Sequence, residues 1–380
     1  MGIDKQRLTA SHVKVGRPLP GDVFDENDHL LLSAGYVIAN ESLLNTLLAR
    51  GLYVDISTFE AHYNSPATLA AEPAAKKFDP FLIRDSLKKR LNRALRDLCR
   101  EPDAIGRIKE IAAATHELAT TDPDGAIAAG LLDDDENYAV RHSVLTAILC
   151  DLAAQELGWP VDKRESVVCA ALSMNATMLD QQNKLVNQAV PLNPQQKELV
   201  REHPQTAAGR LREAGVLDPL WLDAVLEHHE REAGAGYPRG LAAPGEAGQL
   251  VRLADAFGAL ITARGDRKAM TPPQAVRTLL AQEGGGHDAA LAATLVKVLG
   301  LFPPGTFVKL ANGEVAVVHR RGAAPNTPLV ASITSSTGNP YMKPVQRDTR
   351  SKDYTIAGLT LRGKLTTGYD LGILWVKTLR

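Results

Sequence analysis

Apolar and polar positions divide the chain into three regions of different periodicity. From residue 1 to about 56, short apolar stretches alternate with turn residues, which predicts a small α+β module. From Asp79 to about Gly300, apolar positions recur at intervals of three and four, as in the stripe Leu145–Leu152. Beyond Pro303 the period falls to two, and Asn312-Gly313 marks a hairpin. The predicted fold class is mainly α, with a helical bundle between a small N-terminal α+β module and a C-terminal small β barrel.

Turn residues and helix starts place the domain boundaries. Ala, Pro, Ser and Thr dominate between Ser57 and Lys77 without periodicity, which predicts a linker. Several helix starts put a capping side chain before a first-turn proline. They are Asp79-Pro80, Asp122-Pro123, Asn193-Pro194 and Asp218-Pro219. We therefore expect an α+β module at 1–56, a linker at 57–78, a helical domain at 79–302 and a β extension at 303–380.

Charge, apolar runs and cysteine spacing limit the partners, the location and the kinds of site that we expect for this protein. Lys and Arg total 43 against 44 Asp and Glu, so the net charge of −1 favours neither nucleic acid nor an anionic membrane as partner. We find no signal peptide and no apolar run long enough to span a membrane, and we expect a cytoplasmic protein. Cys99, Cys150 and Cys169 lack metal-ligand spacing and are predicted to be buried thiols.

Histidines and one aspartate in the helical region form a candidate metal site. Adjacent histidines at a helix end can direct two imidazoles into one pocket, and a two-metal centre needs ligands from several helices and a bridging group. The candidate ligands are His142, His203, His228, His229 and Asp255. A structural interpretation stays open for each residue: the histidines could be satisfied core residues or helix ends, and Asp255 could pair with an arginine.

The order of these motifs resembles the HD-GYP family, bacterial phosphodiesterases of cyclic di-GMP built on the helical HD-domain bundle. The segment His228–Arg231 followed by Gly234 and Gly236–Pro238 resembles the family's most specific signature, with Ala233 where an Asp is usual. Tyr138 with Arg141–Ser143, His203-Pro204 and Leu253–Phe257 resemble its other motifs in the correct order. The resemblance covers residues 135 to 290 and implies a helical HD-domain fold.

The chain departs from this family at the chemical centre. The family carries a His ligand, a bridging Asp and a Lys near the phosphate, whereas this chain has Met174, Asn175 and Met178. Asn is neutral and cannot bridge two divalent cations, and a thioether is a poor ligand for hard metals. The resemblance therefore implies a degenerate member without an intact catalytic set. It would hold at most one divalent metal, iron or manganese, weakly or not at all.

The Gly-Tyr-Pro loop keeps the family's pattern although the catalytic centre does not. Gly236, Tyr237 and Pro238 form either an ordinary turn or a surface for ligand and partner. In the family this loop is linked to substrate and to partners with diguanylate cyclase (GGDEF) domains. Arg231, Arg264 and Arg267 could hold phosphate oxygens or could be solvated.

Three functions follow from these features. We expect an inactive cyclic di-GMP signalling protein that senses cyclic di-GMP or a related nucleotide, or docks a protein partner. The alternative is a residually active metal-dependent phosphodiesterase, hydrolysing cyclic di-GMP to pGpG or GMP with an incomplete metal site. The third is a helical scaffold without any ligand.

Overall fold

The computed structural model of the chain describes residues 4–9, 12–13, 15–38, 41–63, 77–98, 100, 103–283, 288–360 and 371–378. Two compact units divide the chain: Met1–Lys77 with Thr378–Arg380, and Phe78–Lys377. Two short strands, β5 (Lys77–Phe78) and β11 (Lys377–Thr378), lie at the sequence boundaries of these units. Most of the predicted linker, at 64–76, and Cys99 lie outside the described residues.

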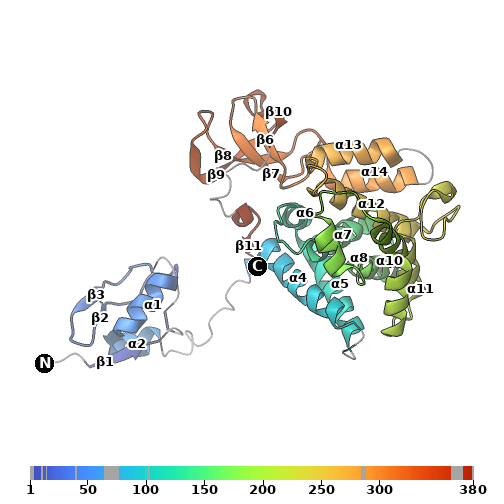
Figure 1. Ribbon diagram of the computed structural model, residues 1–380. Helices are drawn as coiled ribbons and strands as arrows, with labels where there is room; N and C mark the ends of the chain where they lie inside the picture. The colour runs from blue at the N-terminus through green and yellow to red at the C-terminus, as the bar shows by residue number, and fades with distance from the viewer. Residues whose placement is uncertain are drawn as a thin grey trace. The chain divides into compact units, whose positions relative to one another are not determined.

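The first unit is a small antiparallel sheet with two helices (Figure 1). Its strands run in the order β1-β4-β2-β3 and enclose buried aliphatic side chains such as Val23 and Leu52. Helix α1 ends at Arg50, directly before Gly51, which takes a φ of +83°. The elements are β1 (Lys5–Leu8), β2 (Val23–Phe24), β3 (Leu30–Leu32), α1 (Glu41–Arg50), β4 (Leu52–Asp55) and α2 (Ile56–His62).

Helix α2 corrects the start of the predicted linker. The carboxylate of Asp55 accepts a hydrogen bond from the Ser57 backbone N–H at 2.9 Å and caps a helix that continues to His62. Phe59 and Tyr63 of this segment stack at 5.8 Å between ring centroids. The capping side chain and the aromatic pair therefore give local structure to residues that lack a clear periodicity.

Helices fill most of the second unit. Asp79, Asp122, Asn193 and Asp218 each accept backbone N–H groups at a helix start, which confirms the four predicted caps. The helices are α4 (Pro80–Arg96), α5 (Ala104–Thr121), α6 (Pro123–Leu131), α7 (Tyr138–Glu156), α8 (Val161–Ser173), α9 (Leu179–Leu185), α10 (Pro194–Glu213), α11 (Pro219–Glu227), η1 (Glu232–Gly234), α12 (Glu246–Leu260), α13 (Pro272–Glu283) and α14 (Asp288–Leu299). Among the described residues, no helix combines the length and apolar character needed to cross a membrane.

Helix α7 is the centre of this bundle. Nearly all its side chains are buried, and it packs against α5, α6, α8, α12 and α14 (Figure 1). Cys150 on α7 and Cys169 on α8 are buried free thiols, and burial raises the pKa of both. A helix enclosed in this way holds its own side chains rigidly, which matters because its first turns carry part of the candidate site.

The C-terminal region forms an open sheet and not the predicted closed barrel. Its five antiparallel strands run in the order β10-β6-β7-β8-β9, and β9 and β10 are the edges in the described residues. Closure would require these edges to pair with one another. The elements are β6 (Phe307–Leu310), β7 (Val315–Arg320), β8 (Leu329–Thr334), β9 (Pro340–Asp348), η2 (Lys352–Tyr354), β10 (Ile356–Leu359) and η4 (Leu371–Leu374).

Residues of a helix, and not further strands, cover one face of this sheet. Phe307, Val317 and Trp375 form a buried cluster with Ala128 of α6. Asp122, at the N-terminus of α6, is fully buried and pairs with Arg320 of β7. Helix α6 thus covers the face that barrel closure would otherwise bury.

Candidate functional site

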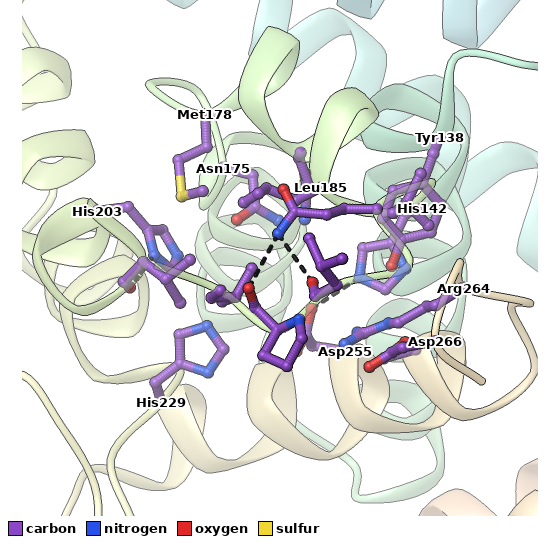
Figure 2. A pocket seen from close by; sticks show the side chains of 18 of the residues that line it. Tyr138, His142, Asn175, Met178, Leu185, His203, His229, Asp255, Arg264 and Asp266 are labelled. Carbon is purple, nitrogen blue, oxygen red and sulfur yellow. Dashed lines mark hydrogen bonds and ion pairs between the residues drawn. The ribbon is translucent and has the colours of Figure 1, made fainter. Parts of the chain in front are cut away.

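Side chains from helices α7, α9, α10 and α12, and from the segments that connect helices, surround a cavity of about 350 Å³ (Figure 2). Four of the five predicted metal ligands line it, and the fifth, His228, is fully buried against His203. The lining residues that bear on chemistry are Tyr138, His142, Asn175, Met178, His203, His229, Tyr237, Asp255 and Arg264. Residues separated by more than a hundred positions in the sequence therefore meet in one pocket.

His203 is held by a carbonyl oxygen that a proline has left free. Pro204 lies inside α10 and has no N–H, so the carbonyl of Val200 lacks the donor it would meet in a regular helix. The Nδ1–H of His203 donates to this oxygen at 2.7 Å. Because Nδ1 carries the proton, the lone pair of Nε2 is free to bind a cation.

His228 also carries its proton on Nδ1, because it hydrogen-bonds to a carbonyl oxygen at the end of a helix. Helix α11 ends at Glu227, which leaves the carbonyls of its last turn without helical partners. The Nδ1–H of His228 donates to the carbonyl of Val225 at 2.6 Å. The Nε2 atoms of His203 and His228 then face each other at 3.1 Å. Two lone pairs at this distance repel one another unless a cation lies between them.

His229 completes a cluster of imidazoles. Ring nitrogens of His203, His228 and His229 all lie within 4.8 Å of one another. His229 also stacks on Tyr237, with 4.7 Å between ring centroids. Burial lowers the pKa of all three histidines, that of His203 to about 3, and neighbouring imidazoles contribute to the effect at His203 and His229. The cluster is therefore neutral at physiological pH and can accept a metal ion without releasing protons from its rings.

His142 and Asp255 form a separate pair across the pocket. His142 Nε2 lies 2.7 Å from Asp255 Oδ1. Burial raises the pKa of Asp255, but the hydrogen bond with His142 and the nearby imidazoles outweigh it, and the net pKa is well below the usual range. A Cβ atom on Gly258 would lie 2.9 Å from the His142 ring. Gly258, which sequence reasoning missed, therefore makes room for this pair.

Asn175, Met178 and Met174, the positions at which this chain departs from the family segment, differ in whether they line the cavity. Asn175 is almost fully buried and lines the cavity, and its Nδ2 has no hydrogen-bond partner among the described residues. Met178 also lines the cavity, and Figure 2 shows its thioether on the same side as His203. Met174 is fully buried and is not part of the cavity lining. The cavity wall thus presents a neutral amide and a thioether at these two positions.

Glu230 organises the Gly-Tyr-Pro loop, a role that sequence reasoning missed. Its fully buried carboxylate accepts backbone N–H groups from Arg239, Gly240 and Leu241 at 2.6, 3.1 and 3.0 Å. A Cβ atom on Gly236 would approach the Arg231 backbone nitrogen to 2.2 Å, so only glycine fits there. The signal in the sequence was an acidic residue directly after two histidines.

The loop also contains the chain's departure from the usual signature. Ala233 has a φ of +57°, in the left-handed region, and the peptide bond between Tyr237 and Pro238 is cis. Asp tolerates the left-handed region better than Ala, because its short polar side chain can hydrogen-bond locally. Ala233 is therefore a strained position within an otherwise well-fixed loop.

The predicted arginines divide into two groups. Arg264 lines the main cavity, and Arg231 lines an adjoining hollow of about 250 Å³ beside His229 and Asp255. Arg267 instead donates through Nη2 to the carbonyl of Ala259 at 2.7 Å. The structure thus brings Arg231 and Arg264 to the site, whereas the guanidinium of Arg267 binds the protein backbone.

Comparisons with known proteins agree with this geometry. Residues 127–291 match the HD domain family. A cyclic di-GMP phosphodiesterase of Pseudomonas aeruginosa is 29% identical over 56% of this chain and 52% of its own length. A 3'3'-cGAMP-specific phosphodiesterase of Vibrio cholerae is 28% identical over 38% of this chain and 33% of its own length. The chain spans at most about half the length of these curated relatives.

The fold also has a counterpart among solved structures. An HDGYP protein from Bdellovibrio bacteriovorus superposes with a TM-score of 0.51 and 18% identity, over 78% of this chain and 99% of that one. At this identity the likeness concerns the fold. Residues 127–291 are therefore an HD domain, and the resemblance to the HD-GYP family that the sequence motifs indicate is confirmed.

Proposed function

We propose that this chain is a regulatory HD domain that binds a cyclic dinucleotide and does not hydrolyse it. The observation that carries the proposal is the placement of Asn175 in the cavity wall, because the resemblance of the sequence motifs aligns this residue with the family's bridging aspartate. An amide carries no charge and cannot hold two divalent cations together. Hydrolysis of this type depends on two ions sharing an activated water, so the step loses its nucleophile.

The residues that remain fit one metal ion better than two. His203, His228 and His229 converge, whereas the carboxylate of Asp255 is engaged with His142. A single ion bound by the imidazoles would supply a Lewis acid that attracts a phosphate oxygen. The chain's own residues would then orient a ligand beside that ion.

The cavity has the features that a nucleotide needs. Arg264 lines it together with Tyr138, and guanidinium groups hold phosphate oxygens in bidentate fashion. Tyr237 adds an aromatic face of the kind on which bases stack. The free N–H of Asn175 can donate to an acceptor oxygen of the ligand. The names of the relatives suggest cyclic di-GMP or 3'3'-cGAMP as the first ligands to test.

A second candidate function is residual hydrolysis at a single metal. The convergence of three imidazoles within 4.8 Å favours it, because one ion can activate one water. His142 and Asp255 would then assist at the far side of the cavity. This function requires measurable turnover by the unmodified chain.

One set of experiments separates these functions. The purified chain is assayed for metal content, for binding of cyclic di-GMP and 3'3'-cGAMP by calorimetry, and for hydrolysis of cyclic di-GMP and pGpG with added manganese or ferrous iron. We expect binding without turnover. The triple variant Met174→His, Asn175→Asp, Met178→Lys is expected to bind more metal and to gain hydrolysis. Robust turnover by the wild type would overturn the proposal, and so would the absence of any thermal shift with nucleotide or metal, which indicates a scaffold.

The Gly-Tyr-Pro loop provides the proposed docking surface for a diguanylate cyclase partner. Glu230 and Gly236 fix its backbone independently of the replaced catalytic positions. Binding of an isolated GGDEF domain is measured for wild type and for Tyr237→Ala, with Tyr341→Ala in the C-terminal sheet as the control. We expect weaker binding only for Tyr237→Ala, and equal binding by all three proteins would exclude this surface.

A further inference from the structure

A second hollow adjoins the main cavity and shares part of its wall. Its volume is about 250 Å³, and His229, Tyr237 and Asp255 line both spaces. The hollow is also lined by two arginines, Arg231 and Arg252. A ligand in the main cavity can therefore extend past Tyr237 toward a space that carries two guanidinium groups.

Arg252 is held in place by a chain of hydrogen bonds that leads to the Gly-Tyr-Pro loop. This residue of α12 is 3% exposed. Its Nε–H donates to Oε1 of Gln249 at 2.8 Å, and the Nε2–H of Gln249 donates to the carbonyl oxygen of Glu230 at 3.2 Å. A side chain fixed in this way loses little conformational entropy when a ligand binds. Sequence reasoning did not identify Arg252.

The charges around the hollow favour an anion. Among the described residues that line it, only Asp255 is acidic, and its carboxylate is engaged with His142. Arg231 and Arg252 contribute two positive charges. Guanidinium groups hold phosphate oxygens in bidentate fashion, and a cleft lined by charges of one sign attracts the opposite charge. The hollow therefore has the chemistry of a phosphate site.

A third arginine lies at a different part of the same ligand space. Arg264 lines the main cavity, and Figure 2 shows it across the cavity from His229. The hollow adjoins the cavity at His229 and Tyr237. Arginines thus lie at both ends of the two adjoining spaces. A cyclic dinucleotide carries two phosphates at opposite sides of its ring, so two separate basic groups match it better than they match a mononucleotide.

We propose that the hollow is a second phosphate subsite, in which Arg231 and Arg252 hold one phosphate of a cyclic dinucleotide while its other phosphate lies beside Arg264. The inference rests on the proposed function and deepens it. It assigns to Arg252 the selection of ligands with two phosphates over ligands with one.

The test compares a ligand with two phosphates and a ligand with one. Calorimetry measures the affinity of the full chain for cyclic di-GMP and for GMP. Arg231→Gln and Arg252→Gln each remove one charged contact, so each should lower the affinity for cyclic di-GMP by about tenfold to a hundredfold. The affinity for GMP should stay within about twofold, because its single phosphate lies beside Arg264. Arg264→Gln should weaken the binding of both ligands.

A matched control separates the subsite from general effects of charge and folding. Arg239 lies in the same loop and pairs with Glu227 at 2.7 Å, so Arg239→Gln should leave both affinities unchanged. Unchanged cyclic di-GMP affinity in Arg231→Gln and Arg252→Gln would overturn the proposal. Equal losses for GMP and cyclic di-GMP in Arg252→Gln would also overturn it, because they indicate a structural role. If Arg252→Gln fails to fold, the exposed Arg231 decides alone.

Inorganic phosphate separates this inference from the sensor function. Phosphate binding that is lost in Arg231→Gln would support the subsite even if no cyclic dinucleotide binds, an outcome that overturns the sensor function alone. Cyclic di-GMP binding that is insensitive to both arginines would leave the sensor function standing and overturn the subsite. A chain that binds neither phosphate nor cyclic di-GMP would overturn both.

Discussion

Pro204 leaves the carbonyl oxygen of Val200 without its usual helical donor, and the Nδ1–H of His203 binds that oxygen. A residue normally regarded as a helix breaker thus determines which nitrogen of its neighbour carries the proton. His203 and Pro204 therefore act together. The proline leaves the Val200 carbonyl oxygen free as an acceptor, and the hydrogen bond to this oxygen orients His203 so that its Nε2 faces the other histidines.

Replacing this proline should separate stability from metal affinity. In Pro204→Ala the new N–H competes for the Val200 carbonyl, so we expect the affinity of the histidine cluster for a divalent metal ion to fall by about tenfold. The helix gains a backbone hydrogen bond, so the free energy of unfolding should rise by about 1 kcal/mol. Calorimetry and urea denaturation measure the two effects. Pro194→Ala, at the first turn of the same helix, is the control and should leave the metal affinity unchanged. Unchanged affinity in Pro204→Ala would show that the carbonyl accepts both donors.

Substitution by glycine is expected to have opposite effects on the free energy of unfolding at Ala233 and at Ala235. Its φ of +57° disfavours a Cβ atom, so Ala233→Gly should raise the free energy of unfolding by about 0.5–1 kcal/mol. Ala235, equally exposed in the same loop, has a φ of −80°. Ala235→Gly should therefore destabilise the protein slightly. Chemical denaturation of both variants checks the prediction, and effects of the same sign would contradict it.

Asp122 should be the main polar anchor of the C-terminal sheet. Its buried carboxylate caps α6 at Gly125 and pairs with Arg320 and with Lys377, the latter at 3.0 Å. Removing it leaves Lys377 without this carboxylate and Arg320 with only the longer contact to Asp124 at 4.0 Å, so Asp122→Ala should cost about 2–4 kcal/mol. Asp180→Ala is the control, because Asp180 forms an exposed pair with Arg96 and should change stability by less than about 1 kcal/mol. Similar decreases in the free energy of unfolding in both variants would show that the buried ion pairs of Asp122 do not stabilise the protein more than an exposed pair.

Glu314 should make the protein sensitive to acid. The hydrogen bond from Arg347 lowers the pKa of Glu314 to about 2 from 4.5. Its ionised form therefore stabilises the folded state above about pH 4.5, and this contribution disappears as the pH falls toward 2. The free energy of unfolding, measured by denaturation at several pH values, should fall less steeply with decreasing pH in Glu314→Gln than in wild type. The exposed Glu198 provides the control, since Glu198→Gln should keep the wild-type slope.

Local signals in the sequence predicted much of the helical fold. The Asp-Pro and Asn-Pro pairs marked helix starts because capping acts within a single turn, as at Asp79 and Asn193. The motif order also predicted that residues as distant as His142 and Asp255 would meet, and their side chains pair at 2.7 Å. These relationships depend on helix faces, which periodicity reveals.

Other features depend on contacts that a sequence does not display. The open sheet was missed because barrel closure is a matter of long-range pairing, and strand β9 (Pro340–Asp348) has no clear alternation. The role of Glu230 was missed because its partners are backbone N–H groups of Arg239–Leu241, which every residue type can offer. Arg267 resembled a phosphate ligand, yet it donates to the carbonyl of Ala259.

Asn175 and Met178, which both line the cavity, have a joint electrostatic consequence. Relative to the Asp and Lys of the family segment, one residue removes a negative charge and the other removes a positive charge. The two changes cancel, so the summed formal charge of the side chains at these two positions stays the same. Either change alone would alter the formal charge of the side chains that line this cavity of about 350 Å³ by one unit. The two substitutions therefore change the chemistry of the cavity wall without changing the summed formal charge of its side chains at these two positions.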